Sequence, residues 1–261
     1  MHLPTAKPAL LISTDFDGTL IMDYDEKPLA PAFFSRLEKL RQNYHVAWVI
    51  NTGRDWASLA ELLIEKKAPV FPDWVVLVER EVHRVERGER VALKHWNKRC
   101  EKVHLDLFHR AGPVLEQMRQ KLRGFKNLSV IQDIASPLGL IAESEEQADE
   151  IQRVLAPLFD EFPEIHAVRN TVYFRFAHID FHKGSCLAAI AVEEGVSSDN
   201  CFAIGDHLND LSMLDPRYAR HIACPSNAIP DVKSKVRRHG GFVASKEGPE
   251  GVGQALDHFF G

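Results

Sequence analysis

The sequence predicts an α/β protein, with an open parallel-sheet core that is interrupted by an inserted α+β domain. Apolar, strand-like runs alternate with amphipathic helical patterns over the first 80 residues, and the same alternation returns over the last third of the chain. The residues between these two parts lack it. Strict alternation is typical of a parallel sheet covered by helices, whereas a mixed order favours an antiparallel sheet.

The first part of the core, residues 1–80, has three predicted strands and two predicted helices. The run 9–14 is apolar enough for a buried strand, and 31–43 has apolar residues at helical spacing. A second strand is predicted at 45–52, a second helix at 55–67 and a third strand at 73–79. Residues 1–80 therefore form the first half of a Rossmann-like core.

The second part of the core, residues 179–261, repeats this pattern. It contains predicted helices at 183–195, 208–214, 228–239 and 251–260, and predicted strands at 200–206, 221–226 and 241–245. The insert between the two parts, residues 81–178, has strand-like runs at 128–134, 138–144, 165–170 and 171–179. A helix is expected after Gly112-Pro113, and another is opened by Ser144, whose capping-box pattern ends at Gln147. We expect an α+β cap domain here.

The composition excludes several classes of protein. Of the 261 residues, 45% are hydrophobic and 26% are charged, which argues against disorder, and the net charge of −5 gives no reason to expect nucleic-acid binding. No segment is apolar over the length of a membrane span, and the apolar run near the N-terminus is too short for a signal peptide. Four cysteines without a Cys-x-x-Cys pair favour reduced thiols. We expect a soluble, cytoplasmic protein.

Polar residues follow the predicted core strands, where open parallel sheets bind their ligands. Asp15 and Asp17 flank Phe16 at the end of the first strand. Because side chains two apart in an extended chain point the same way, both carboxylates can face one cavity while Phe16 turns into the core. Gly18 then allows a sharp turn. The other strand ends or adjoining turns carry Asn51-Thr52-Gly53-Arg54, Lys183-Gly184 and Gly205-Asp206-His207-Leu208-Asn209-Asp210.

These residue types together predict a phosphoryl-transfer site. Asp15, Asp17 and Asp206 would repel one another unless a divalent cation joined them, and ligands that are all oxygen favour Mg²⁺. Thr52 and the backbone amides beside it, that of Gly53 among them, offer donors for a phosphate. Lys183 supplies the positive charge that compensates the carboxylates. Arg54 is expected to make a substrate or structural contact near the mouth of the site.

The motifs resemble those of the haloacid dehalogenase superfamily, and within it the Cof-type, sugar-phosphatase-like hydrolases with a large α/β cap. The resemblance rests on DFDGTL, NTGR, the lysine of HKGSCL and GDHLNDLSML, with SNAIPDVK and EGPEGVGQAL downstream, and it covers nearly the whole chain. One segment departs from the pattern. Where many relatives have Glu-Asn-Gly at the entry to the cap, this chain has Glu79-Arg80-Glu81.

The resemblance implies a Mg²⁺-dependent phosphatase that hydrolyses a small phosphorylated metabolite, above all a sugar phosphate, through an aspartyl-phosphate. It implies that Asp15 is the nucleophile and that Asp17 is the general acid and base. It implies a Mg²⁺ site formed by Asp15, the backbone carbonyl of Asp17, and Asp206. It further implies phosphate contacts from Thr52, Gly53, Lys183 and Asn209, and orientation of the metal and the lysine by Asp210.

Two other functions are compatible with the same residues. A phosphomutase or phosphotransferase of this superfamily would return the phosphoryl group to another hydroxyl. A non-catalytic binding protein on this fold is disfavoured, because every acid, base and metal position is filled. The stretch 80–110 holds nine Lys or Arg against five Asp or Glu, either as a solvated face or as a cap surface that attracts anionic substrates. The sequence leaves the oligomeric state and the identity of the substrate open.

Overall fold

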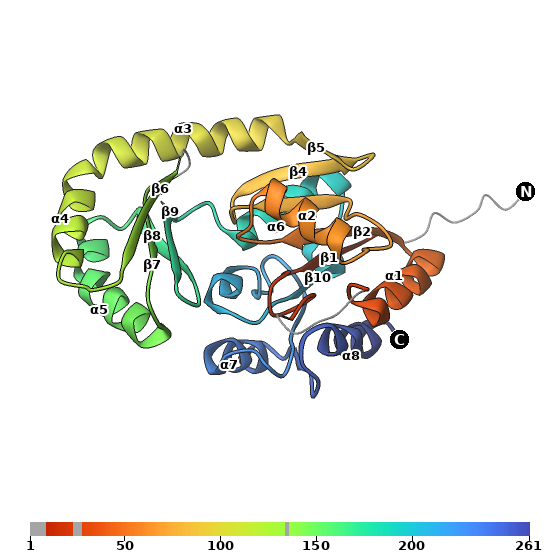
Figure 1. The fold of residues 1–261 in the computed structure, drawn as a ribbon. Coiled ribbons are helices and arrows are strands. Elements are labelled where there is room, and N and C mark those ends of the chain that lie inside the picture. The colour runs from red at the N-terminus through yellow and green to blue at the C-terminus, as the bar shows by residue number, and fades with distance from the viewer. Residues whose placement is uncertain (1–8, 23–27, 134–135) are drawn as a thin grey trace, which may run out of the picture. The chain divides into compact units, whose positions relative to one another are not determined.

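The computed structural model describes residues 9–22, 28–133 and 136–261, and it divides the chain into two compact units (Figure 1). The core unit contains the chain up to residue 93 and from residue 183 onward, and the cap unit contains residues 94–182. The boundaries expected from the sequence fell after residues 80 and 178. The difference at the first boundary arises because the hairpin of β4 (Glu81–Glu86) and β5 (Glu89–Ala92) continues the sheet of the core unit.

The core unit is built on an eight-stranded sheet with the order β12-β11-β10-β1-β2-β3-β4-β5. The strands from β12 to β3 are parallel, and β4 and β5 are added antiparallel. Strand β1 lies at the point where the chain order reverses, because β2 and β3 extend the sheet on one side and β10 to β12 on the other. The parallel strands are β1 (Ala9–Thr14), β2 (His45–Asn51), β3 (Trp74–Leu77), β10 (Cys201–Ile204), β11 (His221–Cys224) and β12 (Phe242–Val243).

Helices cover both faces of this sheet. Helices α1 (Pro31–Asn43), α2 (Trp56–Glu65) and α8 (Gly248–Phe260) share one apolar core with alternate residues of the strands, among them Ile12 and Trp48. Helix α6 contacts β3 and β4, and a hydrogen bond of 2.7 Å from Trp74 Nε1 to Glu194 Oε1 fixes its end. The remaining elements are α6 (Lys183–Glu194), α7 (Pro230–Arg238) and two short 3₁₀ helices, η1 (Ser198–Asn200) and η2 (Leu208–Ser212).

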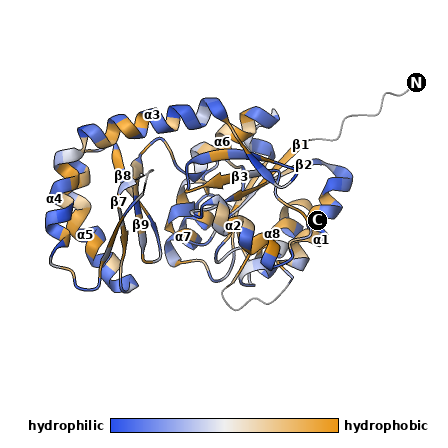
Figure 2. Ribbon diagram, turned by 45° about the horizontal axis from the view of Figure 1, so that its top comes forward, coloured by the Kyte–Doolittle hydropathy of each residue, from blue (hydrophilic) through white to orange (hydrophobic). Residues whose placement is uncertain are grey.

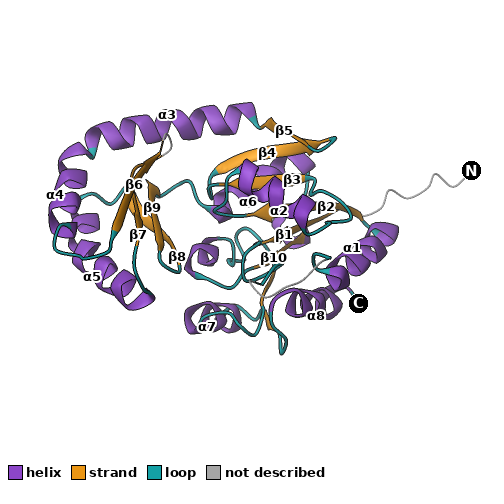
Figure 3. Ribbon diagram, in the orientation of Figure 1, coloured by secondary structure: helices purple, strands orange, loops and turns teal. Residues whose placement is uncertain are grey.

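The cap unit is a four-stranded antiparallel sheet of order β6-β7-β9-β8 with helices packed against it (Figure 3). Leu138 and Phe176 of the sheet join one apolar cluster with side chains of all three helices, and the apolar stripes on these helices are visible in Figure 2. The elements are β6 (Ser129–Asp133), β7 (Ser136–Ile141), β8 (Ile165–Asn170), β9 (Tyr173–His178), α3 (Lys94–Arg110), α4 (Gly112–Leu122) and α5 (Glu145–Glu161).

The predicted fold class is confirmed, with three local differences. Helix α3 and the β4–β5 hairpin were not predicted, and the helix expected at 208–214 is the 3₁₀ helix η2. Ile134, expected at the end of a strand, and residues 1–8, which precede the apolar run judged too short for a signal peptide, lie outside the described residues. In the described part of the chain, no helix has the length and apolar character needed to cross a membrane.

Candidate active site

The candidate site lies at the carboxyl edge of the core sheet, next to β1. Asp15 follows β1, and its backbone N–H donates to the carbonyl of Ile204 at the end of β10 (2.9 Å). The loop after β2 starts at Thr52, whose N–H donates to the carbonyl of Val76 in β3 (2.9 Å). Neighbouring parallel strands thus bring four loops to one edge of the sheet, at the reversal of strand order where such sheets bind ligands.

A buried lysine bridges two carboxylates at the centre of the site. Lys183 Nζ lies 2.7 Å from Asp15 Oδ1 and 2.7 Å from Asp210 Oδ1. The side chains of Lys183 and Asp210 are fully buried, and that of Asp15 is 4% exposed. Helix α6 begins at Lys183, and Asn51 Nδ2 donates to the lysine's carbonyl oxygen (3.0 Å). The lysine is therefore held at both its backbone and its ammonium group.

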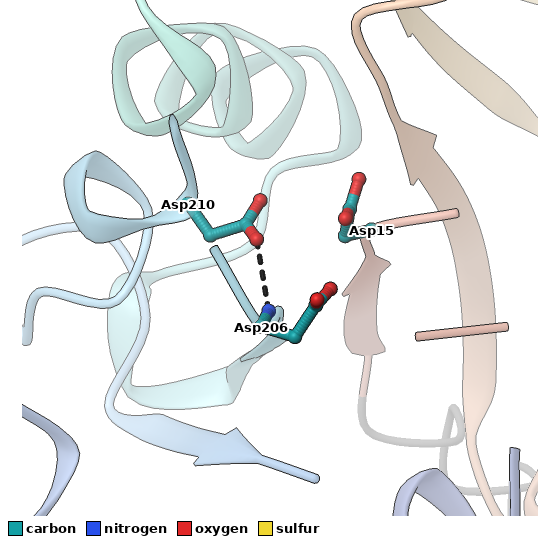
Figure 4. Close-up of side chains that lie close together, drawn as sticks. All are labelled: Asp15, Asp206 and Asp210. Atoms are coloured by element: carbon teal, nitrogen blue, oxygen red, sulfur yellow. Dashed lines mark hydrogen bonds between the residues drawn. The ribbon is translucent and has the colours of Figure 1, made fainter. Parts of the chain in front are cut away.

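Asp210 organises the loop that carries Asp206. Its Oδ2 accepts the backbone N–H groups of Asp206 and His207, both at 2.9 Å, and Figure 4 shows the first of these bonds. A Cβ on Gly205 would lie 2.4 Å from Asp210 Cγ, so only glycine permits this close approach. Because its oxygens are engaged by Lys183 and by two backbone amides, Asp210 acts in this geometry as a support for its neighbours.

Asp206 is held against the loop that follows Asp15. The hydroxyl of Thr19 donates to Asp206 Oδ1 at 2.8 Å, and Thr19 is fully buried. Gly18 has a φ of 75°, and a Cβ there would lie 2.4 Å from Asp206 Oδ2. The glycine thus serves both a left-handed turn and the approach of the carboxylate. Asn227 Nδ2 donates to the carbonyl of Gly18 (2.8 Å) and steadies the same turn.

The charges at this site are strongly coupled. Burial, together with the neighbouring carboxylates Asp210 and Asp206, raises the pKa of Asp15 well above its ordinary value, although Lys183 opposes this. Burial and then Asp210 raise the pKa of Asp206 to about 7. For Lys183, burial alone would lower the pKa, but Asp15 and Asp210 outweigh it and the net pKa is raised. The lysine is therefore charged, and the carboxylates need further positive charge to be ionised together.

This arrangement fits a small divalent cation. Oxygens of Asp15, Asp206 and Asp210 lie within 4.8 Å of one another (Figure 4), and all are hard carboxylate donors of the kind that Mg²⁺ prefers. Asp15 and Asp206 are the better ligands, because the oxygens of Asp210 already accept from Lys183 and from backbone amides. A bound cation would also offset the burial and the carboxylate repulsion that raise the pKa values of these two carboxyl groups.

The carboxylate of Asp17 is paired with Arg54. Arg54 Nε donates to Asp17 Oδ2 at 2.8 Å, and Nη2 donates to Oδ1 at 2.6 Å. The N–H of Arg54 also donates to Thr52 Oγ1 (3.1 Å), so this hydroxyl keeps its own proton for another acceptor. In this structure Arg54 therefore makes a structural contact within the site, one of the two kinds of contact expected for it.

The core unit thus brings together the residues that the sequence singled out. Asp15, Lys183, Asp206 and Asp210 form one cluster, Asp17 is joined to Arg54, and Asn209 is buried beside them. Gly53 lies against Glu79, and Asn209 Nδ2 donates to Glu79 Oε1 at 2.7 Å. Sequence reasoning did not assign supporting roles to several residues, although most of them lie in the motifs that it quoted: Thr19, Asn51, Glu79 and Asn227.

Comparison with known families identifies the class of protein. A family model described as haloacid dehalogenase-like hydrolase matches residues 114–256, and a model described as sucrose-6F-phosphate phosphohydrolase matches residues 8–129. The chain belongs to the haloacid dehalogenase-like hydrolase family, and as predicted from the sequence it is a phosphatase of the Cof type. A comparison with curated protein sequences gives no significant match.

Solved structures share the fold over nearly the whole chain. The sucrose-phosphatase of Synechocystis sp. PCC6803, determined with sucrose and phosphate, aligns with a TM-score of 0.72 at 17% identity, covering 97% of this chain and 98% of that one. A haloacid dehalogenase-like hydrolase from B. subtilis has a TM-score of 0.64 at 19% identity, over 96% and 99% of the two chains. BT1666, a phosphatase from Bacteroides thetaiotaomicron, has a TM-score of 0.61 at 20% identity, over 99% and 98%. At these identities the likeness establishes the fold.

Proposed function

We propose that this protein is a Mg²⁺-dependent phosphatase that hydrolyses a small sugar phosphate through an aspartyl-phosphate on Asp15. The observation that carries the proposal is the buried Lys183, whose ammonium group lies 2.7 Å from Asp15 Oδ1 at the carboxyl edge of the sheet. A nucleophilic carboxylate needs a fixed orientation and an adjacent positive charge for an incoming phosphate, and this lysine provides both.

In the first half of the reaction, the second carboxylate oxygen of Asp15, Oδ2, attacks phosphorus. A bond forms between this oxygen and phosphorus while the bond from phosphorus to the sugar oxygen breaks. Asp17 donates a proton to the departing alkoxide, so the sugar leaves as an alcohol. Thr52, with the amide of Gly53, and Lys183 are the proposed donors to the phosphoryl oxygens, and Asn209 is the proposed fourth contact.

In the second half, water hydrolyses the aspartyl-phosphate. Asp17 takes a proton from the water, whose oxygen attacks phosphorus, and the bond to Asp15 breaks to release inorganic phosphate. Asp15, Asp206 and the backbone carbonyl of Asp17 would hold the Mg²⁺. When bound, the cation supplies positive charge that offsets the charge of the transferring phosphoryl group. Asp210 supports this set through its bonds to Lys183 and to the N–H of Asp206.

The choice of a sugar phosphate is supported by one family model and by one solved structure. One describes a sucrose-6F-phosphate phosphohydrolase and matches the segment that contains Asp15 and Thr52. The Synechocystis protein with the same fold was determined with sucrose and phosphate. We assign recognition of the leaving group to the cap unit. All four cysteines are buried, and none forms a disulfide in the described part of the chain, which supports action in the reducing cytoplasm.

A phosphate-release screen tests this function. The protein is incubated with a panel of sugar phosphates and other phosphate monoesters, with Mg²⁺ or with excess chelator, in oxygen-18 water. We expect Mg²⁺-dependent release of inorganic phosphate that carries one labelled oxygen, with the highest kcat/KM among sugar phosphates. Isomerised sugar phosphate without free phosphate would instead identify a mutase, and release of unlabelled phosphate would contradict attack by water on the intermediate.

A further inference from the structure

Glu79 occupies a strained turn beside the phosphate loop. Val78 and Glu79 have φ angles of 44° and 64°, in the left-handed region that disfavours side chains, above all a β-branched one. Two hydrogen bonds of 3.0 Å hold the turn in place. The N–H of Val78 donates to the carbonyl of Arg54, and the N–H of Glu79 donates to the carbonyl of Thr52. The turn is thereby tied to the loop that begins at Thr52.

The side chain of Glu79 points into the site rather than toward solvent. Glu79 is only 5% exposed, and its Oε1 accepts from Asn209 Nδ2 at 2.7 Å. A Cβ built on Gly53 would lie 3.3 Å from the same oxygen, so the carboxylate fills the space beside this glycine. Glu79 therefore connects two groups that the proposed function assigns to phosphate binding, the loop at Gly53 and the amide of Asn209.

The contact determines which way the Asn209 amide faces. An ionised carboxylate only accepts hydrogen bonds, so it must receive the NH₂ group, and Asn209 Oδ1 has to point away from it. Asn209 is 7% exposed, and its Oδ1 has no hydrogen-bond partner in the described part of the chain. A buried acceptor without a partner is costly, so this amide is arranged for a ligand that the protein alone does not supply.

We propose that Glu79 is a positioning residue for the phosphoryl group, which acts by holding the Asn209 amide in one orientation. One side-chain N–H of Asn209 donates to Glu79. The second N–H and Oδ1 then face the bound phosphate ester and the water that hydrates it. The inference rests on the proposed phosphatase function. It goes beyond it in assigning a role to Glu79, the residue that Glu79-Arg80-Glu81 shares with the Glu-Asn-Gly of many relatives.

The role can be tested by substitutions that separate geometry from charge. Glu79→Gln keeps an acceptor at the same reach, whereas Glu79→Asp keeps the charge and withdraws the acceptor by one methylene group. We expect affinity for inorganic phosphate, measured by calorimetry with Mg²⁺, to fall about tenfold in Glu79→Asp and Glu79→Ala and less than about threefold in Glu79→Gln. The reverse order, with Glu79→Gln impaired and Glu79→Asp intact, would overturn the proposal.

A double-mutant cycle shows whether Glu79 acts through its partner. In an Asn209→Ala background, Glu79→Ala should cause no further loss of phosphate affinity and no further rise in KM, because the amide that it orients is gone. If the two substitutions instead reduce phosphate affinity independently, so that their effects multiply in the double variant, Glu79 does not act through Asn209. Glu194→Ala is the matched control, because it removes another carboxylate that accepts a 2.7 Å bond from a side-chain N–H in the same unit, away from the site. It should leave phosphate affinity unchanged.

These outcomes are distinct from failure of the proposed function. A wild-type protein that neither binds phosphate nor releases it from any ester would overturn the function and this inference together. The inference alone would be overturned if the wild type is active and Glu79→Ala has the same KM and the same phosphate affinity as the wild type. In that case a lower melting temperature of Glu79→Ala would show that Glu79 only stabilises the fold.

Discussion

Arg54 holds the carboxylate of Asp17 through two parallel hydrogen bonds, Nε to Oδ2 at 2.8 Å and Nη2 to Oδ1 at 2.6 Å. The guanidinium is itself fixed, because Nη1 donates to Ser58 Oγ at 2.7 Å and the group lies over the ring of Phe16. The residue proposed to move protons is thus oriented by an arginine from the neighbouring loop.

Arg54→Lys should lower kcat while leaving the fold intact. A lysine ammonium cannot form two parallel bonds to a carboxylate and also reach Ser58, so the orientation of Asp17 is lost. We expect kcat to fall about 10- to 100-fold, less than the roughly 10²- to 10⁴-fold that general acid–base catalysis contributes, because Asp17 is still present, with a smaller change in KM. Steady-state kinetics across pH and a thermal melt measure the two effects.

Arg36→Lys provides the control for this substitution. Arg36 binds Asp257 with the same pair of atoms, Nε and Nη2, at 2.8 and 2.6 Å in the same unit. It should change neither kcat nor KM. An equal loss in both variants would mean that general destabilisation, rather than the orientation of Asp17, explains the result.

Asp15→Asn should abolish turnover without unfolding the protein. Asparagine keeps the shape and an oxygen that can accept from Lys183, but it lacks the attacking charge. We expect kcat to fall by at least ~10³-fold, as for the loss of a nucleophile in other enzymes. Trapping with beryllofluoride, which mimics the phosphoryl group, should succeed with the wild type only. Near-normal turnover in Asp15→Asn would rule out covalent catalysis at this residue.

Lys183→Met should destabilise the core unit strongly. It leaves the buried carboxylates of Asp15 and Asp210 without their shared cation, and breaking such a buried pair costs about 3–5 kcal/mol. Denaturant unfolding measures the loss. Adding Asp210→Asn to Lys183→Met should recover part of the stability but none of the activity, because one of the unpaired charges is then removed. A Lys183→Met protein as stable as the wild type would contradict the buried charge network described here.

The stability of the metal-free protein should fall as pH rises. The pKa of Asp206 is raised from 3.8 to about 7, chiefly by burial and then by Asp210, so the folded state binds this proton more tightly than the unfolded chain does. The stability that this proton contributes is fully present below pH about 4 and is lost as pH rises through about 7. Asp15, whose pKa is raised in the same direction, adds to the effect. Thermal melts of chelator-treated protein at several pH values measure how the melting temperature falls with pH. This dependence should be weaker in Asp206→Asn.

Added Mg²⁺ should reverse that trend. The cation binds the ionised carboxylates, so the rise in melting temperature on adding Mg²⁺ should be larger at pH 8 than at pH 5.5. Asp206→Asn should lose most of this rise together with activity, and Ca²⁺, with its larger and looser coordination, should support turnover poorly. Equal stabilisation by Mg²⁺ at both pH values would show that the acidic cluster is not the cation site.

Much of the fold and the candidate residues could be predicted because their signals are local. Alternation of strands and helices predicted the parallel core, and the loop residues after β1, β2 and β10 were recognisable from short motifs. The β4–β5 hairpin was missed because β5 is exposed along its whole length and lacks the apolar alternation of a buried strand. Its pairing with the core sheet depends on contacts between strands, and these moved the boundary of the cap from residue 80 to residue 93.

The sequence by itself determined which chemical groups gather at the sheet edge, because Asp15, Asp17, Lys183 and Asp206 follow from motif and position in the chain. Only the tertiary structure decided how they are paired. Arg54 binds Asp17, Lys183 joins Asp15 to Asp210, and Glu79 orients Asn209 across 130 residues of sequence. The physical reason is that a hydrogen bond or ion pair depends on ångström-scale distances between side chains from different loops. Those distances are set by the register of neighbouring strands and by turns such as the strained one at Val78, which local sequence does not encode.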